Sequence, residues 1–306
     1  MGQFARIIRN PYALFFYFKK YINLGFLPDK TYISLHYRAS MGKKINWKKP
    51  KTYNEKLQWL KLYDHNPMYT TLVDKYAVKR YVADRIGEKF VIPTLGVWNH
   101  FDDIDFDALP DQFVLKCTHD SGGLVIVTDK ATFDMVAAKR KIEDALDSDF
   151  YKTCREWPYK NVPHRIIAEQ YMIDDRLGEL KDYKFFCFNG TPKYLFVASD
   201  RNKGKQEVKF DYFDINFNRL PLRQAAHPNS TYPIERPQKY DEMLELATEL
   251  SKGIPQVRID LYEVNGHVYF GEYTFFHHGG MVPFIPEEYD YIWGEEILLP
   301  EKSQEG

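Results

Sequence analysis

The stretch VRIDLYEVNGHVYFGEYT, residues 257–274, contains two largely apolar segments separated by Asn265-Gly266. Apolar and polar residues alternate on both sides of Asn265-Gly266, a dipeptide typical of tight turns between antiparallel strands. The stretch is therefore predicted to form a β-hairpin. Charged residues are rare in a hairpin that is otherwise apolar enough to be buried. This one carries four of them, and Arg258, Asp260 and Glu272 are the three whose position depends on the register of the hairpin.

The register of the hairpin determines whether the two carboxylates meet. A strict two-residue turn would place Asp260 across from Gly271 and would turn Glu272 to the other side of the sheet. A three-residue loop, 265–267, with Gly266 at positive φ, moves the pairing by one residue. Asp260 then lies directly across from Glu272.

The second register also brings Arg258 across from Thr274. Its opposite side is an apolar core face: Val257, Ile259, Leu261, Tyr273 and Phe275. Facing carboxylates repel, and burying them uncompensated costs several kcal/mol, so a cation is expected between them. Oxygen ligands without His or Cys suit Mg²⁺, usually with phosphate oxygens completing the octahedron. The alternatives are a two-residue turn that separates the acids, or simple pairing of both with Arg258.

Composition limits the class of protein. The 306 residues can bury a large core and hold about two domains. Because 42 basic residues nearly cancel 43 acidic ones, no overall field recruits nucleic acid or an anionic membrane. The aromatic content of 16 % suits either a well-packed core or a sugar-facing surface. The three cysteines lack CxxC spacing, so we expect a reducing compartment, the cytoplasm, without a disulfide framework or structural zinc.

The N-terminal segment, MGQFARIIRNPYALFFYFKKYINLGFLP, is basic and aromatic. Its longest apolar run, YALFFYF, is too short to span a bilayer, which takes about 20 residues. No small-residue cleavage site follows, and Arg6 stands where a myristoylation signal needs Ser or Thr. We expect a helix that packs on its own protein. A peripheral contact with the inner face of the membrane is the alternative.

Hydrophobic periodicity and turn signals predict a mixed chain of helices and strands. Helices are expected at residues 53–64, 69–87, 132–149 and 240–253. Strands are expected at residues 89–98, 112–119, 123–130, 164–172 and 210–222, with a further hairpin at 183–200 turning at Asn189-Gly190. Antiparallel hairpins with helices on one face indicate α+β layers and not a doubly wound parallel sheet.

Two segments offer groups suited to a nucleotide. Lys116 ends an apolar strand and is followed by Ser121-Gly122-Gly123, where glycines let backbone N–H groups approach phosphate. The GxxxxGKS/T pattern of a P-loop is absent, so a plain hairpin turn is the alternative. Glu169 lies at the edge of another apolar strand, where a carboxylate followed by exposed backbone suits an adenine or ribose.

Two further segments carry charges with an ordinary alternative explanation. Lys184 lies on a predicted strand, where a solvated lysine is the common case. The segment LVDKYAVKRYV carries four charged residues on a predicted helix, and an ordinary charged face explains them equally: Asp74, Lys75, Lys79 and Arg80.

The order of these motifs resembles the ATP-grasp superfamily of carboxylate–amine ligases. The chain has "DK" on a helix, "IP", a strand lysine with a Gly-rich loop, a strand glutamate and a final Asp/Glu hairpin. FGEYTFFHHGG is similar to the Gly-Glu-x-Thr-Phe segment of the TupA-like branch, bacterial proteins associated with teichuronopeptide and capsular polysaccharide synthesis. YNEKLQWLKLYD and VDKYAVKRYV resemble its N-terminal signature. The resemblance covers roughly residues 30–295.

The resemblance implies an α+β ATP-grasp fold, in which two α+β subdomains hold a nucleotide between antiparallel sheets. It implies a basic, helical N-terminal extension at 1–50 and an N-terminal subdomain at 51–110. A small subdomain with the Gly-rich lid would occupy 111–168, and a large subdomain with the metal site 169–306.

By position, the resemblance also implies which residues hold ATP. Lys75 and Lys116 would hold its phosphates from two sides, and residues 121–123 would form a mobile lid loop. Glu169 and the backbone near Tyr171 would read the adenosine. Lys184 would be a further contact on the nucleotide side.

The same resemblance assigns Asp260 and Glu272 to Mg²⁺, and Arg258 to the transferred phosphate. Many members of the superfamily have Asn two residues after the metal-binding Glu, whereas this chain has Thr274, so the number of metal ions stays open. The pair His277-His278 either lines the acceptor site or is structural.

The implied activity is an ATP-dependent ligation. A uronic-acid or amino-acid carboxylate would become an acyl phosphate, and an amine would then attack it to form an amide. By family association, the acceptor belongs to a bacterial surface glycan. Two other hypotheses stay open. One is a glycosyltransferase with a DxD-like site at FDDID, 101–105, or DYFD, 211–214, and the other is a non-catalytic glycan-binding protein.

Overall fold

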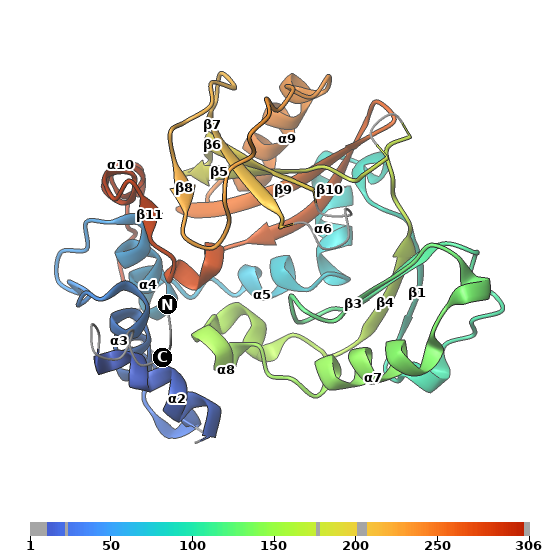
Figure 1. The fold of residues 1–306 in the computed structure, drawn as a ribbon, viewed down its shortest axis with the longest axis horizontal. Helices are drawn as coiled ribbons and strands as arrows, with labels where there is room; N and C mark the ends of the chain where they lie inside the picture. Colours follow the sequence, from blue (N-terminus) through green and yellow to red (C-terminus); the bar gives the residue numbers. More distant parts are fainter. Residues whose placement is uncertain (1–10, 22–23, 176–177, 201–206, 303–306) are drawn as a thin grey trace.

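The computed structural model describes residues 11–21, 24–175, 178–200 and 207–302. Two antiparallel sheets form the framework, and they lie in separate lobes with helices between and around them (Figure 1). This arrangement confirms the predicted α+β class. Among the described residues, no helix is both long and apolar enough to cross a bilayer.

The smaller sheet has four strands in the order β1-β4-β2-β3. Its strands, in chain order, are β1 (Thr94–Trp98), β2 (Phe113–Cys117), β3 (Leu124–Val127) and β4 (Ile166–Gln170). Helix α7 (Met135–Leu146) is capped by Asp134, whose side chain accepts a hydrogen bond from the Ala137 N–H. Its buried residues, Ala138 and Ile142, pack into the same apolar cluster as Phe113. Alternation along β2 therefore leaves every second residue, including Lys116, on the uncovered face.

The larger sheet has five strands in the order β10-β9-β5-β6-β7. They are β5 (Asp182–Phe188), β6 (Thr191–Ser199), β7 (Lys209–Asp214), β9 (Gln256–Val264) and β10 (His267–Thr274). Helix α9 (Tyr240–Ser251) buries Met243, Ala247 and Leu250 in the main core. An isolated bridge between Val91 and Phe270 connects the chain just before β1 to β10, and so joins the two lobes.

The predicted apolar face of the opening hairpin is confirmed, but the mechanism predicted for its register is wrong. The turn has two residues, since His267 pairs with Val264, and Asn265 and Gly266 both have positive φ. A register shift between Phe270 and Glu272 then moves the pairing by one residue. Asp260 therefore lies across from Glu272 as expected. The extra residue is a β-bulge and not a longer loop.

The prediction of one helix over residues 69–87 is also wrong. Helix α5 (Met68–Val73) ends at Asp74, and α6 (Ala77–Ile86) begins three residues later. The Asp74 carboxylate accepts hydrogen bonds from the N–H groups of Tyr76 (2.8 Å) and Ala77 (3.1 Å). It thereby caps α6 and stops α5 in one step. Lys75 lies in this break, and its backbone N–H donates to the Thr118 carbonyl at 3.1 Å, next to the end of β2.

The N-terminal extension contains α2 (Leu14–Tyr21) and α3 (Asp29–Met41). Phe15 is buried against Tyr32 of α3, which confirms that the segment packs on its own protein. Residues 1–10, with Arg6, lie outside the described residues. The alternative membrane contact stays a prediction.

Short elements complete the fold around the two sheets. They are α4 (Tyr53–Tyr63), α8 (Tyr151–Cys154), η6 (Trp157–Asn161), β8 (Arg223–Gln224), η7 (His277–Gly280), β11 (Phe284–Ile285) and α10 (Glu288–Glu296). The 3-10 turns η1 (Pro11–Ala13), η2 (Leu24–Phe26), η3 (Glu88–Phe90), η4 (Phe101–Asp103) and η5 (Lys130–Thr132) lie in the connections. The strand expected at 210–222 ends at Asp214.

The proposed division at residues 50, 110 and 168 stays a prediction. Pairing in the small sheet crosses two of these boundaries, because β1 lies before residue 110 and β4 spans the junction 168/169. Strands that are far apart in the chain form one sheet. A change in composition along the chain does not reveal such pairing.

Candidate active site

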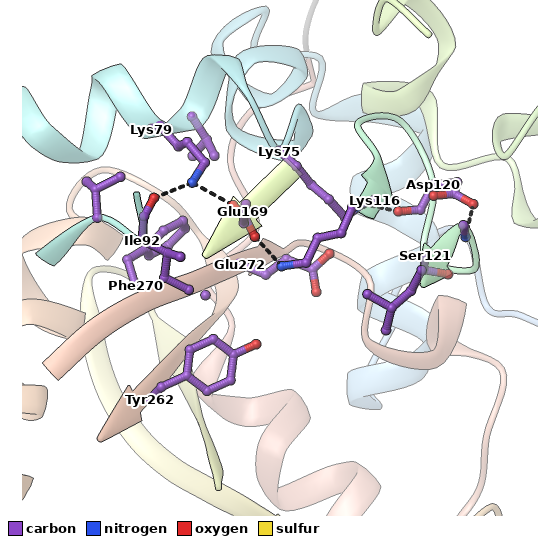
Figure 2. Close-up of a pocket in the computed structure, with 15 residues that line it drawn as sticks. Lys75, Lys79, Ile92, Lys116, Asp120, Ser121, Glu169, Tyr262, Phe270 and Glu272 are labelled. Atoms are coloured by element: carbon purple, nitrogen blue, oxygen red, sulfur yellow. Dashed lines mark hydrogen bonds and ion pairs between the residues drawn. The ribbon is translucent and has the colours of Figure 1, made fainter. Parts of the chain in front are cut away.

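A pocket lies between the two sheets, and both lobes contribute to its walls (Figure 2). Lys75 and Lys79 reach it from the α5–α6 region, Lys116 and Glu169 come from the small sheet, and Glu272 comes from β10. The remaining lining residues are Val78, Val91, Ile92, Asp120, Ser121, Gly123, Leu124, Tyr262, Phe270 and Gly271. The structure thus brings together four residues predicted to bind the phosphates, the adenosine or Mg²⁺: Lys75, Lys116, Glu169 and Glu272.

A second pocket continues the first and shares part of its wall. The shared residues are Ile92, Lys116, Leu124, Glu169 and Tyr262. Beyond them the lining is mainly apolar, and it consists of Val114, Ile126, Gln170, Tyr171, Met172 and Leu180. The combined cleft therefore has a charged end and an apolar end, and Tyr171 lies at the apolar end.

Glu169 connects the two lysines nearest the centre of the cleft. Its carboxylate lies 2.5 Å from the Nζ of Lys116 and 2.5 Å from the Nζ of Lys79. Burial by itself would raise the pKa of Glu169, but the two ammonium groups outweigh it and lower the pKa to about 2. Glu169 is therefore a carboxylate at neutral pH, and it balances the positive charge of Lys79 and Lys116.

Lys79 is the residue that the sequence interpretation missed. Its Nζ also donates to the Ile92 carbonyl at 2.6 Å, and its side chain is only 12 % exposed. Burial lowers its pKa, against the opposing influence of Glu169. A signal was present, because Lys79 stands three residues before Val82 and seven before Ile86, on the flank of the apolar stripe of α6.

The Gly-rich loop is held from within. The Asp120 carboxylate accepts hydrogen bonds from the N–H groups of Gly122 (3.1 Å) and Gly123 (2.5 Å). Lys75 Nζ donates to the Asp120 carbonyl. A side chain at Gly123 would meet Cys117 Sγ at 2.8 Å, so only glycine fits there. Ser121 lines the pocket, and the predicted mobility of the loop stays a prediction.

Arg258 lies next to the predicted metal ligands. Its Nε donates to Asp260 Oδ1 at 2.7 Å, and its Nη2 donates to Asp260 Oδ2 at 2.8 Å and to Thr274 Oγ1 at 2.9 Å. Nη2 is also 3.9 Å from Glu272 Oε2. The guanidinium thus supplies the positive charge that the facing carboxylates require.

Asp260 is completely buried, and Lys184 of β5 forms a second ion pair with it. Burial opposes ionisation of Asp260, but the charges of Arg258 and Lys184 outweigh it and lower its pKa. Lys184 Nζ is also 2.6 Å from Asp182. Lys184 therefore stands beside Asp260 and is not among the residues that line the pocket.

The residues present fit a magnesium ion only together with further oxygen ligands. Asp260, Glu272 and Thr274 provide hard oxygen atoms, and Glu272 faces the cleft. Over residues 11–302, wherever the structure is described, no group of three or more His, Cys, Asp or Glu side chains forms a ready-made metal site. A magnesium site here would therefore depend on phosphate oxygens and water for the remaining positions, as is usual for this ion.

Helix α4 secures the loop that follows the hairpin. Gln58 Nε2 donates to the carbonyl groups of Gly279 (3.0 Å) and Gly280 (2.8 Å), and Lys61 Nζ donates to that of Gly279 at 2.6 Å. This loop, η7, also contains His277, which is buried and contacts Arg258. The NEKLQWLK and FFHHGG motifs are therefore parts of one substructure, although more than 200 residues separate them.

The two DxD-like segments lie elsewhere. Asp211 accepts a hydrogen bond from the Ser230 N–H at 3.1 Å and pairs with Arg219, while Asp214 accepts from the Asn216 N–H at 2.9 Å. In the other segment, Asp102 is 2.6 Å from Lys139. Neither segment contributes to the cleft.

A family model for the TupA-like ATP-grasp proteins matches residues 55–298. The match covers the α4 motif, the cleft and the hairpin. The chain belongs to the TupA-like ATP-grasp family. The predicted family and its ATP-grasp fold are thus confirmed. A search of curated proteins finds no match.

Solved structures of ATP-grasp ligases resemble this TupA-like chain at low identity. The Bacillus anthracis D-alanine–D-alanine ligase complexed with ATP is 14 % identical, over 68 % of this chain and 55 % of its own, with a TM-score of 0.40. The Helicobacter pylori D-alanine–D-alanine ligase is 15 % identical, over 72 % and 61 %, with a TM-score of 0.38. The ATP-grasp ligase PsnB complexed with minimal precursor, Mg and ADP is 11 % identical, over 80 % and 62 %, with a TM-score of 0.39. The chain spans less than two thirds of the length of each, and the family assignment depends on the family match.

Proposed function

We propose that this TupA-like ATP-grasp protein is an ATP-dependent carboxylate–amine ligase. The observation that carries the proposal is the cleft between the two sheets, which has lysines and Glu272 at one end and an apolar lining at the other. This distribution matches the chemistry of ATP, with an anionic triphosphate at one end and a flat, largely apolar base at the other. A family match that includes every wall of the cleft supports the same interpretation.

In this proposal the base lies against Tyr171, Met172 and Leu180, and the phosphates extend toward Lys75 and Lys116. The two lysines are held at present by protein acceptors, Asp120 and Glu169 respectively. Phosphate oxygens carry more negative charge than a carbonyl group, so Lys75 gains by exchanging its partner. Ser121 and the N–H groups of the glycine loop are placed to contact the phosphates once Asp120 releases them.

The fit of the oxygen ligands supports Mg²⁺ as the companion of ATP. Glu272 and Asp260 would hold the ion, with Thr274 as a further ligand, and the ion would neutralise charge on the phosphates. Arg258 adds a fixed positive charge beside these carboxylates. The residues therefore supply positioning and charge stabilisation, and phosphoryl transfer requires little else from a protein.

The proposed reaction has two balanced steps. A carboxylate oxygen of the first substrate attacks the γ-phosphorus, the bond to the β-γ bridging oxygen breaks, and ADP leaves with an acyl phosphate formed. The nitrogen of an amine then attacks the acyl carbon, inorganic phosphate departs, and the nitrogen loses a proton to give an amide. No protein nucleophile is needed, since ATP itself activates the carboxylate.

The substrates follow from family association. We place the carboxylate on a uronic-acid or amino-acid component of a bacterial surface polysaccharide, and the reaction in the cytoplasm where ATP is supplied. The second substrate is an amine or an amino acid. This assignment depends on the TupA-like family and not on a contact within the cleft.

The decisive experiment follows ADP release from purified protein with Mg²⁺, ATP and pools of uronic acids and amino acids. We expect release only when a carboxylate and an amine are both present, and mass spectrometry should find the amide. A response to nucleotide sugars with ATP ignored would replace the ligase by a glycosyltransferase. Binding of glycans without any turnover would leave only the non-catalytic hypothesis.

A further inference from the structure

The side chain of His277 is locked into one tautomer by its two neighbours. Its Nδ1 lies 2.6 Å from Arg258 Nη1. A guanidinium can only donate hydrogen bonds, so Nδ1 must be the bare, accepting nitrogen. A neutral imidazole then carries its proton on Nε2. That nitrogen lies 2.7 Å from Gln224 Oε1, which is an acceptor.

Gln224 is itself fixed by a third segment. Its Oε1 also accepts a hydrogen bond from the Tyr212 hydroxyl at 2.8 Å. Tyr212 lies on β7, Gln224 on β8 and His277 on η7, and all three are buried. Hydrogen bonds thus run in one direction from Arg258 through His277 to Gln224, with Tyr212 closing the far end.

The surroundings of His277 keep its ring neutral. The rings of Phe186 and Phe196 lie 5.0 and 5.4 Å away, centroid to centroid. Burial, together with the nearby His278 and the charge of Arg258, lowers the pKa of His277 well below its usual value. A neutral ring is the form that can accept from Arg258, so the burial and the geometry agree.

We propose that His277 is a positioning residue that fixes the guanidinium of Arg258 for phosphoryl transfer. Asp260 and Thr274 hold the Nε and Nη2 edges of Arg258, and His277 holds Nη1, so that all three nitrogens have a defined partner. Neither His277 nor Arg258 is among the residues that line the pocket, and Arg258 approaches the lining through Glu272, 3.9 Å from its Nη2. The inference depends on the proposed function, in which Arg258 stabilises the transferred phosphate. A preorganised charge acts more strongly than one that must first be oriented.

The kinetic test compares three variants. His277→Phe keeps an aromatic ring at this position but removes the nitrogen that accepts the hydrogen bond from Arg258. We expect kcat for ADP release to fall about 10- to 100-fold. KM for ATP should stay within about 3-fold, since orientation acts in the transition state. His277→Asn restores an acceptor close to the Nδ1 position and should recover kcat to within about 5-fold of the wild type. His267→Phe, at the far end of the same hairpin, is the matched control and should leave both constants unchanged.

A spectroscopic test stands apart from activity. With ¹⁵N-histidine labelling, the two-bond correlations of the ring distinguish the tautomers, and His277→Phe identifies the signal. We expect the Nε2–H form. A protonated ring, an Nδ1–H ring, or a His277→Asn variant as slow as His277→Phe would overturn the inference. If the wild type shows the Nε2–H form but no ATP-dependent ligation, the arrangement stands and the proposed function fails.

Discussion

The charges around Arg258 and the charges of the cleft both combine basic with acidic side chains, but their surroundings differ. Asp260, Arg258 and Lys184 lie inside the large sheet, where the Asp260 side chain is 1 % exposed. In the cleft, the side chains of Lys116 and Glu272 are 23 % and 31 % exposed. A buried network must satisfy every charge internally, whereas partly exposed charges can exchange partners for water or a ligand. The first region is therefore a fixed scaffold, in which the proposed Mg²⁺ would take over part of the charge compensation of Asp260, and the second is adaptable.

The largest expected effect on stability comes from breaking the buried network. Arg258→Met leaves Asp260 and Asp182 facing a single cation, Lys184, and we expect the free energy of unfolding to fall by about 3–5 kcal/mol. Urea unfolding followed by circular dichroism measures it. The matched control is Arg80→Met, because Arg80 is exposed on α6, and its change should stay within about 0.5 kcal/mol. Equal losses in the two variants would contradict the comparison.

Glu169 is the buried exception within the cleft, and it makes the contrast depend on pH. Its pKa, lowered to about 2 by the two lysines against the effect of burial, implies stability that is present above pH 4.5. This contribution is lost as the pH falls from about 4.5 toward 2, since the folded state takes up its proton later than the unfolded one.

We therefore expect Glu169→Gln to lower the free energy of unfolding at pH 7 by up to about 3 kcal/mol. The difference in the free energy of unfolding between wild type and variant should decrease steadily as the pH falls from 4.5 to 2. Urea titrations at a series of pH values would measure it. If this difference in the free energy of unfolding did not depend on pH, the two lysines would not be holding Glu169 in its ionised form.

The bulge at Gly271 gives a smaller effect that connects the two regions. A Cβ at this position would lie 2.8 Å from the Tyr262 ring and 3.1 Å from the Asp260 carbonyl oxygen. Gly271→Ala should cost about 1–3 kcal/mol and should slow ADP release by displacing Glu272. In a double-mutant cycle, Tyr262→Ala should recover part of the lost stability. If the stability changes of the two single substitutions simply added up in the double variant, the Tyr262 ring would not be the group that the new Cβ meets.

The smallest effect on stability is expected at Glu272, which is more exposed than its partner Asp260. Glu272→Gln should change the free energy of unfolding by less than about 0.5 kcal/mol, because its contact with Arg258 is long, at 3.9 Å. ADP release should nevertheless be abolished, since the proposed Mg²⁺ loses a carboxylate. The exposed Glu143→Gln on α7 is the control and should retain activity. Retained turnover in Glu272→Gln would remove the metal assignment.

Local patterns predicted the parts of the fold that local physics determines. Helix α4 was predicted from its periodicity, and the Asn189-Gly190 turn from a dipeptide that readily adopts positive φ at both residues, as it does here. The pairing of Asp260 with Glu272 was predicted correctly but from a three-residue loop, whereas the structure has a two-residue turn followed by a bulge. The order of the charged motifs along the chain was also sufficient to recognise the TupA-like ATP-grasp family.

Other features depend on contacts between distant segments. In the sequence, Asp74 is one more charged residue within a helical pattern. In the structure, Arg165 pairs with it at 2.7 Å and its carboxylate caps α6. In the sequence, Lys79 appears on an ordinary charged helix face. In the structure, its Nζ lies 2.5 Å from the Glu169 carboxylate of β4. Neither partner is within reach of a periodicity argument, because each lies about 90 residues away along the chain.

From its residues alone, this chain predicted α+β layers and an apolar face on its last hairpin, because alternation and turn chemistry act over a few residues, and the order of its motifs resembled the ATP-grasp superfamily. The bulge at Gly271, the break at Asp74 and the direction of hydrogen bonding through His277 arise only when separate segments pack together. Packing and charge compensation are properties of the whole core. They determine which partner each buried charged or polar group finds, and the order of residues along the chain does not determine it.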